Sequence, residues 1–261
     1  MTPARAPAAS MQHAEGLPAA ARQYALLATG LGAFMSMMDV TIANVALPTI
    51  ASDLGTSASA SIWVVNAYQF ALTMLIVPMA ALSDIVGYAR VYRIALCVFA
   101  VASLGCSLSH TLLILALARV LQGVGASAMT TTVGAINRLA YPRHMLGRAA
   151  GQSAMVVALG AAAGPVVGGL ILSFAPWPWL FAINIPLSLL ALILALRFVP
   201  NAPGTRHSFD LPSAVMSALS FGALITTITV LGHHGKPYVV LASAVVTVTI
   251  GAVFLRSQRR L

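Results

Sequence analysis

The stretch WLFAINIPLSLLALILALRFV, residues 179–199, has the length and composition of a helix that crosses a lipid bilayer. A helix needs about 20 apolar residues to span roughly 30 Å of hydrocarbon, and the charged Arg197 lies close to the end of this stretch. A strand of a membrane barrel needs only about 10 residues, in which polar and apolar side chains alternate. Because this stretch is longer and does not alternate, it predicts a transmembrane α-helix.

Comparable apolar runs occur along almost the whole chain of 261 residues. The chain is 59% hydrophobic and 7% charged, so it has more apolar surface than a soluble core can bury. The predicted fold class is therefore an all-α integral membrane protein. Residues 1–23, which contain several Pro and Ala, predict a disordered tail. The eight predicted spans cover residues 24–47, 61–82, 92–108, 111–137, 150–174, 179–199, 211–231 and 239–255.

Basic residues mark one side of this predicted membrane protein. Of the 14 Lys and Arg residues, all except Arg119 and Lys236 lie in the two tails or in every second loop. Short loops rich in Lys and Arg stay on the cytoplasmic side during insertion, so both termini are predicted to be cytoplasmic. Charges spread over loops do not form the basic patch that nucleic-acid binding requires. The predicted partner is the lipid bilayer, and no nucleic acid is expected.

The sequence gives no pattern typical of an enzyme or of a metal or cofactor site. Cys97 and Cys106 lie in one apolar run, where cysteine is an ordinary small hydrophobic residue. His233 and His234 are adjacent, but no third potential ligand lies near them in the sequence. We therefore predict no catalytic residues, no metal and no cofactor.

Two charged residues lie well inside predicted spans, Asp39 in the first and Arg119 in the fourth. Each costs about 2.5 to 3.5 kcal/mol at a helix centre, so such a residue is a functional candidate by default. Their distances from the span ends put both in the outer half of the bilayer, at nearly the same depth. They are expected either to pair or to share a water-filled cavity. Two roles stay open: a fixed ion pair that holds the two helices together, or a titratable Asp39 carboxylate that carries a proton under the influence of Arg119.

Amide side chains are the other polar groups inside the spans. Gln122 lies one helical turn after Arg119, and we assign it to the same coupling site. Asn44, Asn66 and Gln69 are candidates for the lining of a cavity, although amides also hold membrane helices together.

The fifth predicted span contains the sequence GAAAGPVVGG, residues 160–169. Small residues spaced every four positions let two helix backbones approach closely, and a proline removes one backbone donor. We expect this segment to be a close helix contact with a hinge. Its residues are Gly160, Gly164, Pro165, Gly168 and Gly169.

Four segments together resemble the major facilitator superfamily, most closely its fourteen-helix drug:proton antiporter branch. They are MMDVTIANVALPTI (37–50), LARVLQGVGAS (117–127), GAAAGPVVGG (160–169) and WPWLFAINIP (177–186). Arg119 stands at the position of the family's arginine implicated in proton coupling, and Asp39 stands at the acidic position of the first-helix motif. Our hypothesis is that Asp39 is deprotonated to bind a cation and reprotonated to release it. The resemblance also implies proton-driven efflux of amphipathic or cationic drug-like compounds across the inner (plasma) membrane of a bacterium.

The loop ALSDIVGYARVYR, residues 81–93, departs from the family pattern because it lacks the leading Gly and several basic residues. Asp84 and Gly87 fit the pattern, and Arg90 or Arg93 is a substitute for the missing charges. In the family this loop is thought to latch two halves together through charge contacts. We therefore expect a weakened latch formed by Asp84, Gly87 and Arg90.

The resemblance also implies two six-helix halves with substrate bound between them. Residues 24–199 supply one half, residues 200–210 a cytoplasmic linker, residues 211–255 two extra helices and residues 256–261 a basic tail. The chain is therefore expected to be truncated. The alternative is a non-transporting fragment or a half-transporter subunit that needs a partner, either a missing C-terminal half or a second copy.

Overall fold

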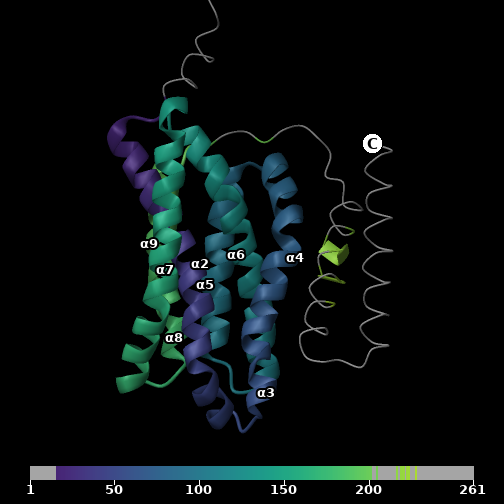
Figure 1. Cartoon of the computed structure of the whole chain (residues 1–261). Helices are drawn as coiled ribbons and strands as arrows, with labels where there is room; N and C mark the ends of the chain where they lie inside the picture. The colour runs from purple at the N-terminus through teal and green to yellow at the C-terminus, as the bar shows by residue number, and fades with distance from the viewer. Residues whose placement is uncertain are drawn as a thin grey trace, which may run out of the picture.

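The computed structural model describes residues 16–201, 204, 216, 218–220, 222, 223 and 227. Within this part of the chain the regular structure is entirely helical (Figure 1). The helices are α2 (Ala19–Asp53), α3 (Ala58–Ser61), α4 (Trp63–Val86), α5 (Tyr88–Ser107), α6 (Leu112–Ala140), the short 3-10 helix η1 (Arg143–Met145), α7 (Leu146–Phe174), α8 (Trp179–Ala182) and α9 (Asn184–Phe198).

Six helical segments in the described residues are long and apolar enough to cross a membrane. They match the first six predicted spans, with α3 and α4 forming the second and α8 and α9 forming the sixth. The all-helical membrane fold is therefore confirmed. The two further predicted spans, 211–231 and 239–255, fall almost wholly outside the described residues, as do most of the linker 200–210 and the tail 256–261.

The first span is longer at both ends than its predicted range of 24–47. It begins at Ala19, so the predicted tail of residues 1–23 ends earlier than expected. Ala, Arg and Gln favour helix, and Arg22 stacks over the ring of Tyr141, with its Cζ 5.5 Å from the ring centroid. At the other end the helix continues through Pro48 to Asp53. A proline removes one backbone hydrogen bond, which a helix packed against neighbours tolerates.

The six spans form one bundle in which α2 and α6 are central (Figure 1). Glycines on α6 allow two neighbours to approach it closely. A Cβ at Gly123 would lie 2.6 Å from the carbonyl of Tyr68 on α4, and a Cβ at Gly125 would lie 3.0 Å from the carbonyl of Ala95 on α5. These approaches bring polar side chains of α4 and α5 toward the start of α6.

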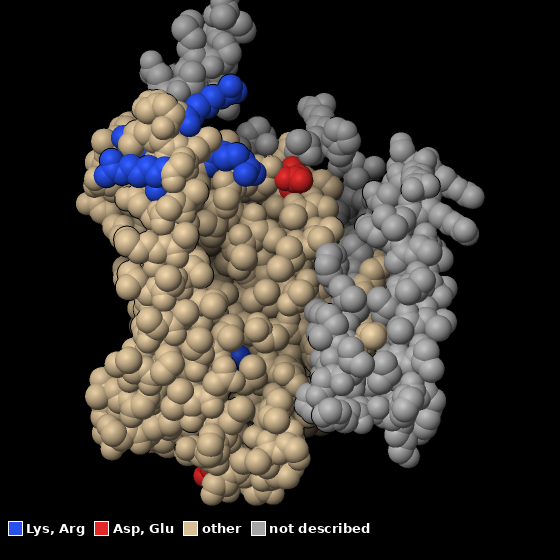
Figure 2. All heavy atoms as spheres, in the orientation of Figure 1, with Lys and Arg blue, Asp and Glu red and all other residues tan. Residues whose placement is uncertain are grey.

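Basic side chains gather at one end of the bundle, uppermost in Figure 2. Arg138 lies in the last turn of α6, Arg143 in η1 and Arg197 in the last turn of α9, so these residues belong to the end at which α6 joins α7. The positions of Lys and Arg in the tails and alternate loops predicted this gathering of basic residues at one end. That this end faces the cytoplasm stays a prediction.

Candidate functional site

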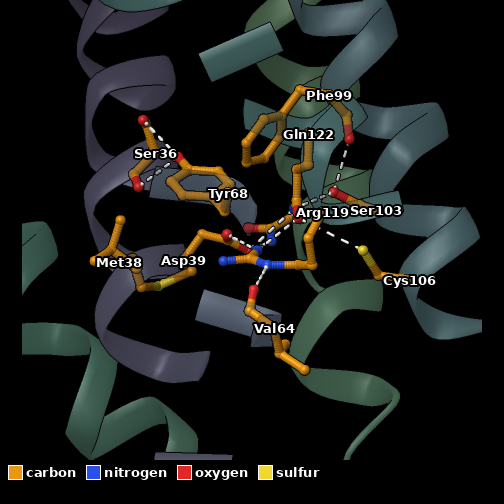
Figure 3. A network of polar contacts seen from close by, with 12 residues as sticks. Ser36, Met38, Asp39, Val64, Tyr68, Phe99, Ser103, Cys106, Arg119 and Gln122 are labelled. Atoms are coloured by element: carbon orange, nitrogen blue, oxygen red, sulfur yellow. Dashed lines mark hydrogen bonds and ion pairs between the residues drawn. The ribbon is translucent and has the colours of Figure 1, made fainter. Parts of the chain in front are cut away.

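An ion pair between Asp39 and Arg119 lies in the core of the bundle (Figure 3). Asp39 comes from α2 and Arg119 from α6. Both side chains are completely buried. Of the two expected arrangements, a direct pair or a shared water-filled cavity, the structure therefore has the direct pair.

Gln122 joins the pair, as its position one turn after Arg119 predicted. Its Oε1 accepts a hydrogen bond from Nη1 of Arg119 at 2.6 Å, and its Nε2 donates to Oδ1 of Asp39 at 3.1 Å. The same Nε2 also donates to Oγ of Ser103 on α5 at 2.9 Å. The amide thus links α6 to α2 and α5.

Asn184, the first residue of α9, is a site residue that the sequence analysis missed. Its Nδ2 donates to Oδ1 of Asp39 at 2.8 Å. The signal in the sequence was an amide within the apolar run 179–199, in a segment already quoted for its family resemblance. The structure buries this side chain completely. Asp39 therefore accepts hydrogen bonds from three donors, which come from Arg119, Gln122 and Asn184.

Aromatic rings enclose the guanidinium of Arg119. Its Cζ lies 4.3 Å from the ring centroid of Tyr68 and 5.4 Å from that of Phe181, distances at which a ring face attracts a cation. Its Nε donates to the backbone carbonyl of Val64 at 2.9 Å. Its Nη2 and Oδ1 of Asn184 are buried without a hydrogen-bond partner in the described part of the chain.

The electrostatics of this network make its protonation state important. Burial of an ion costs several kcal/mol in a real protein, and only close pairing with good hydrogen bonds offsets this cost. Protonation of Asp39 would leave the charge of Arg119 buried without its counter-charge. The arrangement can therefore couple a proton to the packing of α2, α6 and α9.

A separate pocket of about 400 Å³ lies between α2, α4, α6 and α7. Gln69 lines it, as predicted, whereas Asn44 and Asn66 do not. Asn44 instead donates to the carbonyl of Val40 on its own helix at 3.1 Å. Ser36 of α2 also lines the pocket, but Asp39, one turn later, does not.

Tyr68 lies between Ser36, which lines the pocket, and the ion pair (Figure 3). Its hydroxyl is 3.0 Å from Oγ of Ser36 and donates to the Ser36 carbonyl at 3.0 Å. Its ring covers Arg119. Tyr68 was not predicted as a site residue, because a tyrosine in an apolar run carries no charge to single it out.

The glycine segment of α7 packs against α2 on both sides of Asp39. A Cβ at Gly160 would lie 2.6 Å from the carbonyl of Phe34, one at Gly164 would overlap Thr41, and one at Gly168 would lie 3.0 Å from Cγ1 of Ile42. Gly169 has open space around its Cβ position, and Pro165 is exposed. Three of the five predicted residues thus form a close helix contact, and the hinge role stays a prediction.

The predicted latch residues lie at the junction of α4 and α5. Gly87 has a φ of 99°, a conformation that favours glycine, and joins the two helices. Oδ1 of Asp84 accepts a hydrogen bond from Tyr88 at 2.6 Å, and Arg90 lines a pocket of about 690 Å³. Arg93 donates to the carbonyls of Ala195 and Val199 at the end of α9. Arg93 is therefore hydrogen-bonded to the end of α9, and a latch role of these residues stays a prediction.

A family comparison decides the identity of this bundle. Residues 29–255 match the profile of the Major Facilitator Superfamily. The chain belongs to this superfamily. The match includes Asp39, Arg119, the glycine segment and Asn184.

Relatives in the major facilitator superfamily include proteins from several bacteria. The chain is 46% identical to the uncharacterized transporter YebQ of Escherichia coli (strain K12) over 247 residues, 94% of this chain and 54% of that protein. It is 38% identical to the riboflavin transporter RibZ of Clostridioides difficile (strain 630), over 72% of this chain and 42% of that one. It is 34% identical to the putative multidrug resistance protein MdtD of Escherichia coli O81 (strain ED1a), over 89% of this chain and 49% of that protein. The chain thus spans about half the length of these major facilitator relatives.

Solved structures share the major facilitator fold. A bacterial homologue of the human lysosomal transporter Spinster, in an inward-facing and unoccupied conformation, aligns with a TM-score of 0.62 at 20% identity. The alignment covers 81% of this chain and 53% of that structure. At this identity the likeness concerns the fold alone.

Proposed function

We propose that this chain takes part in proton-coupled export of small amphipathic molecules across the inner (plasma) membrane of a bacterium, with its basic end facing the cytoplasm. The observation that carries the proposal is the buried Asp39 carboxylate, held by donors from α6 and α9. The names of two relatives, a riboflavin transporter and a putative multidrug resistance protein, support small organic substrates.

The energy that a moving proton provides is similar in size to the energy needed to disrupt the buried ion pair. A proton that moves through 100 mV provides about 2.3 kcal/mol before any pH gradient is counted. Loss of one partner of a buried pair costs about 3 to 5 kcal/mol. Protonation of Asp39 therefore perturbs the contacts of α2 by an amount comparable to the driving force. Two conformations of a protein commonly differ by a few kcal/mol, so a perturbation of this size can shift their populations.

The experiment measures dansylamide uptake by inverted membrane vesicles that contain the chain, with and without the co-produced C-terminal half of YebQ. Dansylamide is fluorescent and uncharged at neutral pH. Accumulation that requires a proton gradient and collapses with a protonophore is expected. The Asp39→Asn variant should take up at least about tenfold less dansylamide, because the asparagine side chain cannot bind and release a proton.

Matched variants separate coupling from folding. Asp53→Asn removes a carboxylate that accepts from Nε1 of Trp177 at 2.7 Å near the end of α2, and its uptake should stay gradient-dependent. Asp39→Glu keeps a titratable group and should retain part of the coupling. Unchanged, protonophore-sensitive uptake by Asp39→Asn at equal membrane levels would rule out the proposal.

A second candidate is a half-transporter subunit that works only with a partner. The alignment of this chain covers 54% of YebQ. Uptake that appears only when the C-terminal half of YebQ is present would support this second candidate. Uptake without it would favour transport by copies of this chain alone.

A further inference from the structure

The pocket between α2, α4, α6 and α7 has an uncharged lining. Each of the described residues that line it is apolar, a glycine, or a neutral polar residue. The polar groups come from Ser36, Gln69, Thr130 and Ser153. Amphipathic molecules fit such a surface, because apolar side chains provide the area and a few polar groups fix the orientation.

The charges close to this pocket do not favour a cation. The carboxylate of Asp39 is completely buried and already paired with Arg119. Nη1 of Arg138 lies 3.8 Å from the Cβ position of Gly134, a lining residue, so a positive charge stands beside the pocket wall. Against the residues that the structure describes, a bound cation would lose water without gaining a counter-charge.

Gln69 is the lining group that is free to bind a ligand. The hydroxyl of Ser36 contacts Tyr68, that of Thr130 donates to the carbonyl of Ala126 at 2.8 Å, and that of Ser153 accepts from Asn137 at 2.9 Å. The Gln69 side chain is exposed, and no hydrogen bond to it is found within the described part of the chain. Its amide offers both donors and an acceptor.

We infer that this pocket takes an uncharged amphipathic molecule rather than a cation, and that the Gln69 amide recognises its polar group. This inference rests on the proposed function, because it names the substrate class of the same transporter. The expected substrates were amphipathic or cationic compounds, and the inference limits them to uncharged amphipathic ones. Asp39 carries the proton and does not contact the substrate.

The test is equilibrium binding to the full chain in lipid nanodiscs, so that it does not depend on transport. Three fluorescent probes share one dimethylaminonaphthalene body: dansylamide is neutral, a dansylamide with an ethyl-trimethylammonium tail is cationic, and the free sulfonate is anionic. Dansylamide is expected to bind at least about tenfold more tightly than either charged probe.

Two substitutions on α4 test the role of Gln69. Gln69→Leu should weaken dansylamide binding about fivefold, because it removes a hydrogen bond. Gln69→Glu should tighten binding of the cationic probe about tenfold, because it adds a counter-charge in the pocket. Asn66→Asp, one turn earlier and outside the lining, is the matched control and should leave the preference for the neutral probe unchanged.

Equal or tighter binding of the cationic or anionic probe would overturn the inference, and so would failure of all three probes to bind. A shift in selectivity with Asn66→Asp as large as that with Gln69→Glu would also overturn it. Neutral selectivity without gradient-driven uptake would remove the proposed function and leave the binding inference standing. Gradient-driven uptake that prefers the cationic probe would overturn the binding inference and leave the proposed function standing.

Discussion

Asp39 and Ser36 lie one turn apart on α2 but belong to two different environments. Asp39 is completely buried in a charged network, whereas Ser36 lines a pocket whose described wall is uncharged. Tyr68 separates them, with its ring on Arg119 and its hydroxyl on Ser36. The bundle therefore keeps its charges paired in the core and presents neutral polar groups to the pocket.

This difference follows from the cost of charge in a low-dielectric environment. An ion that faces a partly apolar pocket without a partner is unfavourable, whereas a neutral amide or hydroxyl there costs much less. Proton binding and substrate binding can therefore occupy neighbouring but separate places. Tyr68 contacts both places, with its ring over Arg119 and its hydroxyl on Ser36.

The largest expected effect comes from breaking the charged network. Arg119→Ala should lower the free energy of unfolding by about 3 to 5 kcal/mol, because it leaves the Asp39 carboxylate buried and unpaired. The measurement is unfolding by SDS in mixed micelles. Arg138→Ala removes an exposed arginine of the same helix and should change stability by no more than about 0.5 kcal/mol.

A double variant shows whether charge, rather than lost volume, causes this effect. Asp39→Asn combined with Arg119→Met keeps an acceptor for Gln122 and Asn184 but removes both charges. Replacing a buried pair by neutral groups of similar size is often tolerated, so at least half of the lost stability should return. Equal stability of Arg119→Ala and Arg138→Ala would contradict this account of the core.

An intermediate effect is expected at the opposite face of α2. Gly164→Ala should destabilise the bundle by about 1 to 3 kcal/mol, because its Cβ would overlap Thr41 and lie 2.9 Å from the carbonyl of Met38. Gly169→Ala meets nothing within 4 Å and should be neutral, or more stable by up to about 1 kcal/mol through helix propensity. The same unfolding assay compares the two. Equal effects at the two positions would show that α7 is not closely packed at Gly164.

The sequence predicted the charged centre because charges within apolar runs are rare and costly. Asp39 and Arg119 could be paired on depth alone, and Gln122 followed from helical spacing. Asn184 and Tyr68 were missed, because a neutral polar residue in a membrane helix has many ordinary roles. Asn184 and Tyr68 join the network because α9 and α4 pack against α2. That packing is a tertiary property, which the sequence of each helix does not show.

The pocket lining was predicted less well for the same reason. Asn44 lies one turn after Val40 and continues the same face of α2, but it comes after the last residue of this helix that lines the pocket and donates to the Val40 carbonyl instead. Asn66 and Gln69 share a face of α4, yet only Gln69 lies at the level of the pocket. Which amide lines the pocket depends on the packing of α6 and α7, which the composition of α4 does not encode.

The smallest expected effect comes from the contact between the two environments. Tyr68→Phe keeps the ring over Arg119 and removes only the hydroxyl that contacts Ser36, so it should cost about 0.6 kcal/mol, a typical value for a hydrogen bond in a membrane protein. Tyr68→Leu also removes the ring, and the lost cation–π attraction should add about 0.5 to 2 kcal/mol in the SDS unfolding assay. If the two variants are equally stable, the ring does not hold Arg119, and the hydroxyl alone joins the pocket wall to the core. If Tyr68→Phe abolishes gradient-driven uptake with so small a loss of stability, this hydroxyl transmits the state of the core to the pocket.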